Sequence, residues 1–331
     1  MIASLPPGAS AYPGSLTFLD LMRRNRRESL AIMAAVVMLG VLLGGVIAAG
    51  LAGGAGAADA GQLGASALLG AFAALVAGAL GAAWSWFGGA GAILAMSGGH
   101  RISREHDPEL FNVVEEMAIA AGLPMPAVYL IPDEAMNAFA TGRDPAHAAM
   151  AITTGLRKRL TRDELQGVIA HEMAHVRHLD IRFGMLMATM VGLIVFACDA
   201  AWRVIVRGGA GRRGGGKKGG GALLIVLALA LAIVAPFLSR LMQLAYSRRR
   251  EYLADAGAVE LTRNPEGLAA ALQKLADDSK PLVEGANRST AHLFIVNPLR
   301  RMREARQSLD TIFSSHPPIQ ERIARLMALT R

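Results

Sequence analysis

Four long runs of apolar residues constrain the fold of this 331-residue chain more than any other feature. They lie near residues 29–52, 64–96, 184–202 and 222–238 and carry almost no charge. Each is near or above the roughly 20 residues that an α-helix needs to cross a bilayer. The chain is 53% hydrophobic and only 18% charged, which is too apolar for an ordinary soluble domain. The sequence therefore predicts a mainly α integral membrane protein with about four membrane helices.

The basic residues lie mostly beside these runs, which predicts an orientation for the first of them. Arg23, Arg24, Arg26 and Arg27 precede the first run and are expected to stay on the cytoplasmic side. That run exceeds the apolar stretch of about 7–15 residues in a cleaved signal peptide, so a retained anchor is expected. A net charge of +8 would favour nucleic acid binding in a soluble protein, but here lipid headgroups are the expected partner and no nucleic acid is expected.

Two interpretations of the third and fourth runs remain open. The loop between them, 203–221, is rich in glycine and basic residues. If both runs cross the membrane, this loop lies outside, against the positive-inside tendency. If neither crosses, the pair forms a hairpin that dips into the membrane or packs on its face. Both interpretations place the residues before and after the pair on the same side.

Gly40 and Gly44 raise a second alternative. A small-xxx-small pair allows close packing of membrane helices, but the chain holds 37 glycines, so chance spacing explains the pair equally well. The single cysteine, Cys198, lies inside the third run. One cysteine excludes a disulfide framework, and its apolar setting disfavours a thiol nucleophile.

Between the second and third runs the composition becomes that of a globular domain. An amphipathic helix is predicted after the Asp-Pro pair at 107–108. Two segments rich in β-branched residues, 127–133 and 147–156, are separated by turn-forming residues and predict a small hairpin or meander. A Thr-x-x-Glu capping box at 161–164 then begins another helix.

That second helix carries the sequence HEMAH at residues 171–175. Positions i and i+4 share one face of a helix, so His171 and His175 can direct ring nitrogens to one tetrahedral metal. Glu172 lies at the edge of that face, where it can take a proton from an attacking water. The alternative is an exposed face with two histidines, but the neighbouring residues are apolar, and buried ionisable groups need a partner such as a metal. His178 lies off the ligand face and is expected to be solvated.

A catalytic zinc takes three protein ligands and keeps one position open. Ile181 stands where the metzincins have their third histidine, so another donor is needed. Glu251 and Asp255 are the best remaining donors, because they lie at i and i+4 of a predicted helix. Glu251 can complete the metal site while Asp255 accepts a hydrogen bond from a ligand histidine. Alternatively, both are solvated carboxylates that pair with the arginines at 248–250.

Five segments resemble the HtpX-like membrane metalloproteases, relatives of the eukaryotic CAAX prenyl endopeptidase. They are NAFATG (137–142), AITTGL (151–156), DELQGVIAHEMAHVRHLD (163–180), SRRREYLADAGAV (247–259) and HPPIQERI (316–323). The segments occur in the family's order and with comparable spacing. The N-terminal lead and the glycine-basic loop at 208–221 look like additions to the family pattern.

The resemblance implies a gluzincin site. His171, His175 and Glu251 would bind one Zn²⁺ per subunit, and Glu172 would act as the general base. Asp255 would stand behind the first ligand histidine.

The resemblance also implies how a substrate is held. His316 and Arg322 match family positions that approach the scissile carbonyl, where a donor stabilises the oxyanion. A peptide would pair with an edge strand formed by Asn137, Ala138, Phe139, Ala140, Thr141 and Gly142.

The expected fold is a multi-pass membrane protein with a cytoplasmic α+β zinc peptidase domain that carries a small sheet. Its expected parts, in chain order, are a cytoplasmic lead (1–28), two membrane helices with a short turn (29–97), the first part of the peptidase domain (98–182), the third and fourth apolar helices (183–246), and the second part of the domain (247–331).

The expected function is zinc-dependent cleavage of misfolded or damaged membrane proteins in their cytoplasmic segments. The resemblance implies a quality-control role in the bacterial inner membrane. Self-cleavage is a further expectation, with the loop at 208–221 as an exposed target. The alternative is a catalytically silent scaffold that binds peptides at the edge strand. Cleavage within the membrane is disfavoured, because the charged segment RKRLTRDELQG precedes the HEMAH sequence.

Overall fold

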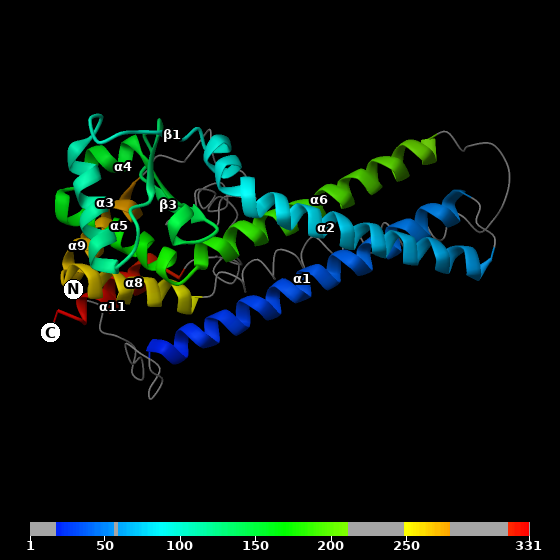
Figure 1. Ribbon diagram of the computed structural model, residues 1–331, viewed down its shortest axis with the longest axis horizontal. Helices are drawn as coiled ribbons and strands as arrows, with labels where there is room; N and C mark the ends of the chain where they lie inside the picture. The colour runs from blue at the N-terminus through cyan, green and yellow to red at the C-terminus, as the bar shows by residue number, and fades with distance from the viewer. Residues whose placement is uncertain (1–17, 56–58, 211–247, 279–316, 331) are drawn as a thin grey trace. The chain divides into compact units, whose positions relative to one another are not determined.

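The computed structural model describes residues 18–55, 59–210, 248–278 and 317–330 (Figure 1). The chain divides into two compact units. One, the helical unit, comprises residues 28–86 and 186–242, and the other, the α+β unit, comprises residues 1–27, 87–185 and 243–331. The helical unit consists of parts of long apolar helices, whereas the α+β unit combines a sheet with shorter helices.

Three helices contain the apolar runs that fall within the described ranges. They are α1 (Phe18–Ala55), α2 (Ala60–Met96) and α6 (Asp180–Ala210). Segments Arg27–Gly53, Ala60–Met96 and Asp180–Val204 are long and apolar enough to cross a membrane. These match the first three predicted spans. The fourth, 222–238, lies outside the described residues, as does most of the predicted loop 203–221. The first part of that loop was predicted wrongly, because residues 203–210 continue helix α6.

Small residues allow α1 and α2 to approach closely in the helical unit. A side chain at Gly44 would place its Cβ 2.5 Å from the Cβ of Ala74 and 2.7 Å from the carbonyl oxygen of Gly70. Gly40 is less confined, since a Cβ there would meet only Ile194 at an ordinary 3.6 Å. Of the two interpretations, close helix packing is therefore correct for Gly44.

We predict that Gly44→Leu destabilises the detergent-solubilised protein by about 1–3 kcal/mol, because the added side chain forces α1 away from α2. Gly78→Leu is the matched control, since a Cβ at Gly78 on α2 meets nothing within 4 Å. Melting temperatures of the two variants and the parent provide the measurement. Equal melting temperatures for both variants would contradict the close packing at Gly44.

The α+β unit combines a four-stranded sheet with six α-helices in its described part. The strands are β1 (His100–Arg101), β2 (Ala127–Ile131), β3 (Ala138–Gly142) and β4 (Ala148–Thr153). The helices are α3 (Pro108–Ala121), α4 (Thr154–Arg159), α5 (Arg162–Arg177), α8 (Arg248–Thr262), α9 (Pro265–Asp277) and α11 (Ile319–Met327).

The sheet order is β1-β2-β4-β3, which corrects the predicted hairpin or meander. β2 and β4 are parallel neighbours, with Ala127 opposite Ala149 and Ile131 opposite Thr153. The chain passes from β2 to the far side of β4, forms β3, and returns through a 3₁₀ turn to pair β3 antiparallel with β4. The turn-forming residues between β2 and β4 do not indicate that β3 lies on the far side of β4. β3 is an edge strand, as the resemblance implied for residues 137–142.

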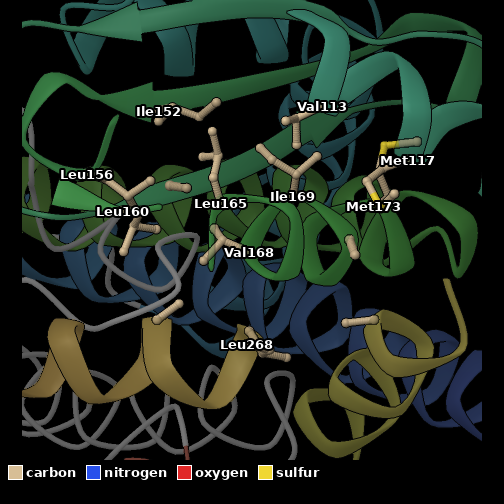
Figure 2. Packing of buried hydrophobic residues seen from close by; sticks show 14 of the residues in the cluster. Val113, Met117, Ile152, Leu156, Leu160, Leu165, Val168, Ile169, Met173 and Leu268 are labelled. Atoms are coloured by element: carbon tan, nitrogen blue, oxygen red, sulfur yellow. The ribbon is translucent and has the colours of Figure 1, made fainter. Parts of the chain in front are cut away.

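Helix α5 lies at the centre of the core and is buried on most of its circumference. Figure 2 shows Leu165 and Ile169 directed toward β4 and α3, while Val168 on another face is directed toward Leu268 of α9. α8 packs along a further side. Because apolar contacts surround α5, its polar residues His171 and Glu172 are also withdrawn from solvent, with 1% and 3% of their surface exposed.

Side-chain caps fix where the helices of this unit begin. Thr161 and Glu164 form both hydrogen bonds of a capping box at the start of α5, as predicted. Asp107 caps α3 by accepting a hydrogen bond from Leu110 N at 3.0 Å. Asp107 also accepts two hydrogen bonds from Arg157, at 2.6 and 3.0 Å. The cap thereby ties α3 to α4.

The pKa of Asp107 makes this tie sensitive to pH. Burial raises this pKa, but the hydrogen bonds from Arg157 and Leu110 outweigh it, so the pKa lies below its ordinary value of 3.8. The stabilisation by the carboxylate is thus complete above the ordinary pKa and is lost as the pH falls through the lowered one.

We predict that Asp107→Ala lowers the free energy of unfolding at pH 7 by about 1–2 kcal/mol, because a cap and an ion pair are both lost. The difference from the parent should shrink as the pH is lowered below about 4, which thermal unfolding at several pH values would measure. Asp107→Asn, which keeps the cap but not the charge, is expected to lie in between. A difference that stays constant with pH would contradict a role for the charge.

Candidate active site

Three side chains from two helices converge at the C-terminal half of α5. His171 and His175 lie one turn apart on α5, and Glu251 reaches them from the first turn of α8. Their donor atoms all lie within 4.8 Å of one another. His171 and Glu251 are buried, whereas His175 keeps a partly exposed side chain. The structure thus brings together the three predicted metal ligands.

The spacing of these donors fits a tetrahedral metal site. The two Nε2 atoms are 3.2 Å apart, close to the roughly 3.3 Å expected between two nitrogens that each lie about 2.0–2.1 Å from zinc. The Glu251 oxygens lie 3.7 Å from His175 Nε2 and 3.8 Å from His171 Nε2. Two imidazoles and one carboxylate are a donor set that zinc takes in catalytic sites. Glu251 is 3% exposed, which excludes the solvated alternative, and its position beside the two histidines fits the predicted role of metal ligand.

His171 is held from behind by a carboxylate and an arginine. Its Nδ1 lies 3.0 Å from Asp255 Oδ1. Arg322 of α11 donates to both oxygens of Asp255, at 2.6 and 2.9 Å. Burial raises the pKa of Asp255. The charge of Arg322 and the hydrogen bond with His171 lower this pKa by more, so it lies below its ordinary value. Asp255 therefore stands behind the first histidine, and Arg322 pairs with it.

His175 has an equivalent support that the sequence did not indicate. Its Nδ1 lies 3.1 Å from Asp180 Oδ2, and Arg250 Nη1 donates to the other oxygen at 3.1 Å. Burial lowers the pKa of His175, but the hydrogen bond with Asp180 and the charge of Glu251 raise it to about 9. Asp180 was missed because position i+5 of a continuous helix lies about 140° around the axis from His175.

Glu172 lies beside the ligands and contacts the edge strand. Its Oε2 accepts a hydrogen bond from Ala140 N of β3 at 2.9 Å. Burial raises the pKa of Glu172 to about 7, and the negative charge of Glu251 adds to the rise. A carboxylate with a pKa near neutrality can both accept and return a proton.

The remaining predicted residues lie around this centre. All five residues of β3 are buried, and Asn137 directly before it is fixed by Thr153, whose Oγ1 accepts from Asn137 N at 2.9 Å. His316 lies outside the described residues. His178 is partly buried rather than solvated, and burial lowers its pKa to about 4.

The family model for peptidase family M48 matches residues 104–330. The chain belongs to peptidase family M48. It is accordingly a metalloprotease that hydrolyses peptide bonds, and M48 membership implies a bound metal, usually zinc, at a site such as His171, His175 and Glu251. The resemblance found in the sequence is thus confirmed.

The chain is similar to two proteins that are named proteases and to one solved structure. A protein named Protease HtpX homolog from Dictyoglomus turgidum is 46% identical over 234 residues, covering 71% of this chain and 73% of that one. A namesake from Lactiplantibacillus plantarum is 42% identical over 311 residues, covering 93% and 98%. The crystal structure of S. mikatae Ste24p matches 76% of this chain, which spans 57% of the Ste24p chain, at 18% identity and a TM-score of 0.47.

We predict that Arg322→Met lowers the free energy of unfolding by about 3–5 kcal/mol, because it leaves the buried carboxylate of Asp255 without its cation. Arg325→Met on the same helix is the comparison, since Arg325 is partly exposed, pairs with Glu321 one turn away and lies 3.8 Å from the ring centre of Tyr252. A loss of about 1–2 kcal/mol is expected there. Chemical or thermal unfolding in detergent measures both. A loss no greater for Arg322→Met than for Arg325→Met would contradict a stabilising role for the buried pair.

Proposed function

We propose that this M48 protein is a membrane-embedded endopeptidase with one Zn²⁺ per subunit, which cleaves cytoplasmic segments of misfolded or damaged membrane proteins. The observation that carries the proposal is the position of Glu172. This carboxylate is 3% exposed, adjoins the ligand set in sequence, and accepts a hydrogen bond from the backbone of an edge strand. A proton acceptor therefore lies between a metal site and a strand to which a peptide can add.

The chemistry is divided between the metal and the chain. Zinc held by His171, His175 and Glu251 would lower the pKa of a water and polarise the scissile carbonyl. Glu172 takes the proton of the attacking water and later delivers it to the leaving amine. Its pKa of about 7 suits both transfers, because neither form is strongly favoured at neutral pH. Asp255 at Nδ1 of His171 and Asp180 at Nδ1 of His175 would leave the two Nε2 atoms available to hold the metal.

The edge strand would align the substrate. In an antiparallel pair, successive residues direct their backbone groups alternately toward and away from the neighbouring strand. Ala140 N bonds Glu172 and not β4, so the side of β3 that does not pair with β4 faces Glu172. A peptide that pairs with residues 137–142 by strand addition would run past Glu172 and the metal ligands.

Arg322 and His316 are the proposed donors to the oxyanion. Two of the Arg322 nitrogens bond Asp255. The third, Nη1, has no hydrogen-bond partner among the described residues and lies 3.5 Å from Glu251 Oε2, an atom at the ligand set. A charged donor in this position would stabilise negative charge on the tetrahedral intermediate. His316 precedes α11 in sequence and would approach from the same segment.

The apolar helices and the basic residues beside them support the proposed location. Three described helices are long and apolar enough to cross a membrane, and arginines 23, 24, 26 and 27 precede the first span. By the positive-inside rule, the site would face the cytoplasm, and the family resemblance implies the bacterial inner membrane. A protease anchored there would meet membrane proteins as its main substrates and the lipid bilayer as its surroundings. In detergent, neighbouring copies would cleave each other at the loop 208–221.

We predict that Glu172→Gln abolishes hydrolysis of an unfolded model protein, with a loss of at least about 10²–10⁴-fold, while zinc binding is retained. Both forms are loaded with zinc in detergent, bound metal is quantified, and cleavage is followed by electrophoresis. Glu260→Gln, at an exposed position on α8, is the matched control and should cleave like the parent.

Two outcomes would contradict the proposal. Cleavage by Glu172→Gln at the parental rate would remove Glu172 as the base. If both forms hold zinc and neither cleaves any of several substrates, the chain is instead a scaffold that binds peptides at β3.

A further inference from the structure

We propose that Asp180, the first residue of α6, is a positioning residue for the metal ligand His175, and that Arg250 holds Asp180 in place. The inference rests on the proposed metal site. It assigns a role to a carboxylate outside the HEMAH and Glu251 segments. It also fastens one metal ligand to the first turn of a helix that is long and apolar enough to span a membrane.

The two ring nitrogens of His175 have different partners. Nε2 faces the ligand set, 3.2 Å from His171 Nε2 and 3.7 Å from Glu251 Oε1. Nδ1 faces Asp180 Oδ2 at 3.1 Å. A carboxylate at Nδ1 keeps the proton on that nitrogen and leaves the lone pair of Nε2 for the metal. Asp180 therefore selects the tautomer and fixes the plane of the ring.

The same arrangement occurs at the other ligand histidine, which supports the same role for both carboxylates. His171 Nδ1 meets Asp255, and a fully buried arginine, Arg322, holds Asp255. His175 Nδ1 meets Asp180, and the buried Arg250 holds Asp180. Each ligand histidine is thus oriented by a carboxylate that is itself oriented by a buried arginine.

The backbone between α5 and α6 is shaped to bring Asp180 to this position. Leu179, between the two helices, has a φ of 62°, a left-handed conformation that is uncommon for residues other than glycine, asparagine and aspartate. In an unbroken helix Asp180 would point about 140° away from His175. The break at Leu179 turns the chain, so that the first residue of α6 meets a side chain of α5.

Arg250 links this carboxylate to the third ligand. It directly precedes Glu251 on α8, bonds Asp180 at 3.1 Å, and places its guanidinium 4.5 Å from the ring centre of Phe183, also on α6. The start of α6 therefore contacts both segments that supply ligands. A shift of this turn would alter the direction of His175 and with it the affinity for metal.

The experiment measures zinc affinity, by competition with a chromophoric chelator, in the full-length detergent-solubilised protein. All variants carry Glu172→Gln, so that proteolysis cannot remove material. Asp180→Ala is expected to weaken zinc binding about 10–100-fold, the usual effect of losing such a partner. Asp180→Asn, which keeps the shape and an acceptor oxygen, should lose less. Asp277→Asn, an exposed carboxylate on α9, is the control and should bind zinc like the parent.

Arg250→Lys tests the second part of the proposal. It should weaken zinc binding in the presence of Asp180 but add nothing to Asp180→Ala, because Arg250 acts through that carboxylate. If Arg250→Lys lowers zinc affinity by the same factor in the protein with Asp180 and in the protein with Asp180→Ala, the assigned role of Arg250 is wrong.

Three results would overturn the inference on Asp180, and they are distinguishable. If Asp180→Ala and Asp180→Asn lower the melting temperature of the metal-free protein but leave zinc affinity unchanged, Asp180 is only a structural anchor of α6. If Asp180→Ala does not fold, the test rests on Asp180→Asn. A zinc affinity of Asp180→Asn equal to that of the parent would then also mean that Asp180 is only a structural anchor of α6. If the parent itself binds no zinc, the metal site and the proposed function fail together with this inference.

Discussion

The burial of α5 is the constraint on which the rest of the α+β unit depends. This helix packs against α3, the sheet, α8 and α9, so a charge on one of its buried faces is removed from water. Transfer of an unpaired charge from water to such an interior is costly. His171 and Glu172 are tolerated there because carboxylates, arginines and a backbone amide surround them. The polar groups in this core form one connected network.

That network connects distant parts of the chain to one centre. Asp255 and Glu251 come from α8, Arg322 from the C-terminal helix α11, and Asp180 from the first turn of α6. A buried arginine that lost its carboxylate would be as costly as a carboxylate that lost its arginine. The site and the packing of these helices are therefore stabilised by the same interactions. The edge strand β3 joins them through the hydrogen bond from Ala140 to Glu172.

Several features could be predicted from local sequence, because local physics determines them. The capping box at Thr161, the turn spacing of His171 and His175, and the apolar length of the first three runs need no knowledge of distant residues. The pairing of strands was predicted wrongly, since the turn-forming residues after β2 suggested a hairpin. Whether the strand after β2 pairs with β2 or lies beyond β4 is determined by contacts between strands, which turn-forming residues do not reveal.

The sequence by itself determined that a helix carries two histidines and a glutamate at metal-site spacing, and that long apolar helices flank it. Helical spacing nominated Glu251 and Asp255 but left their roles open, and the resemblance carried by the motifs identified the family and implied those roles. Only the tertiary structure decided that Glu251 is buried at the ligand set, 3.7 Å from His175 on a different helix. It also decided that Asp180 faces His175, because the left-handed backbone at Leu179 interrupts the helical period. Periodicity describes which side chains share one face of one element, whereas these contacts join different elements.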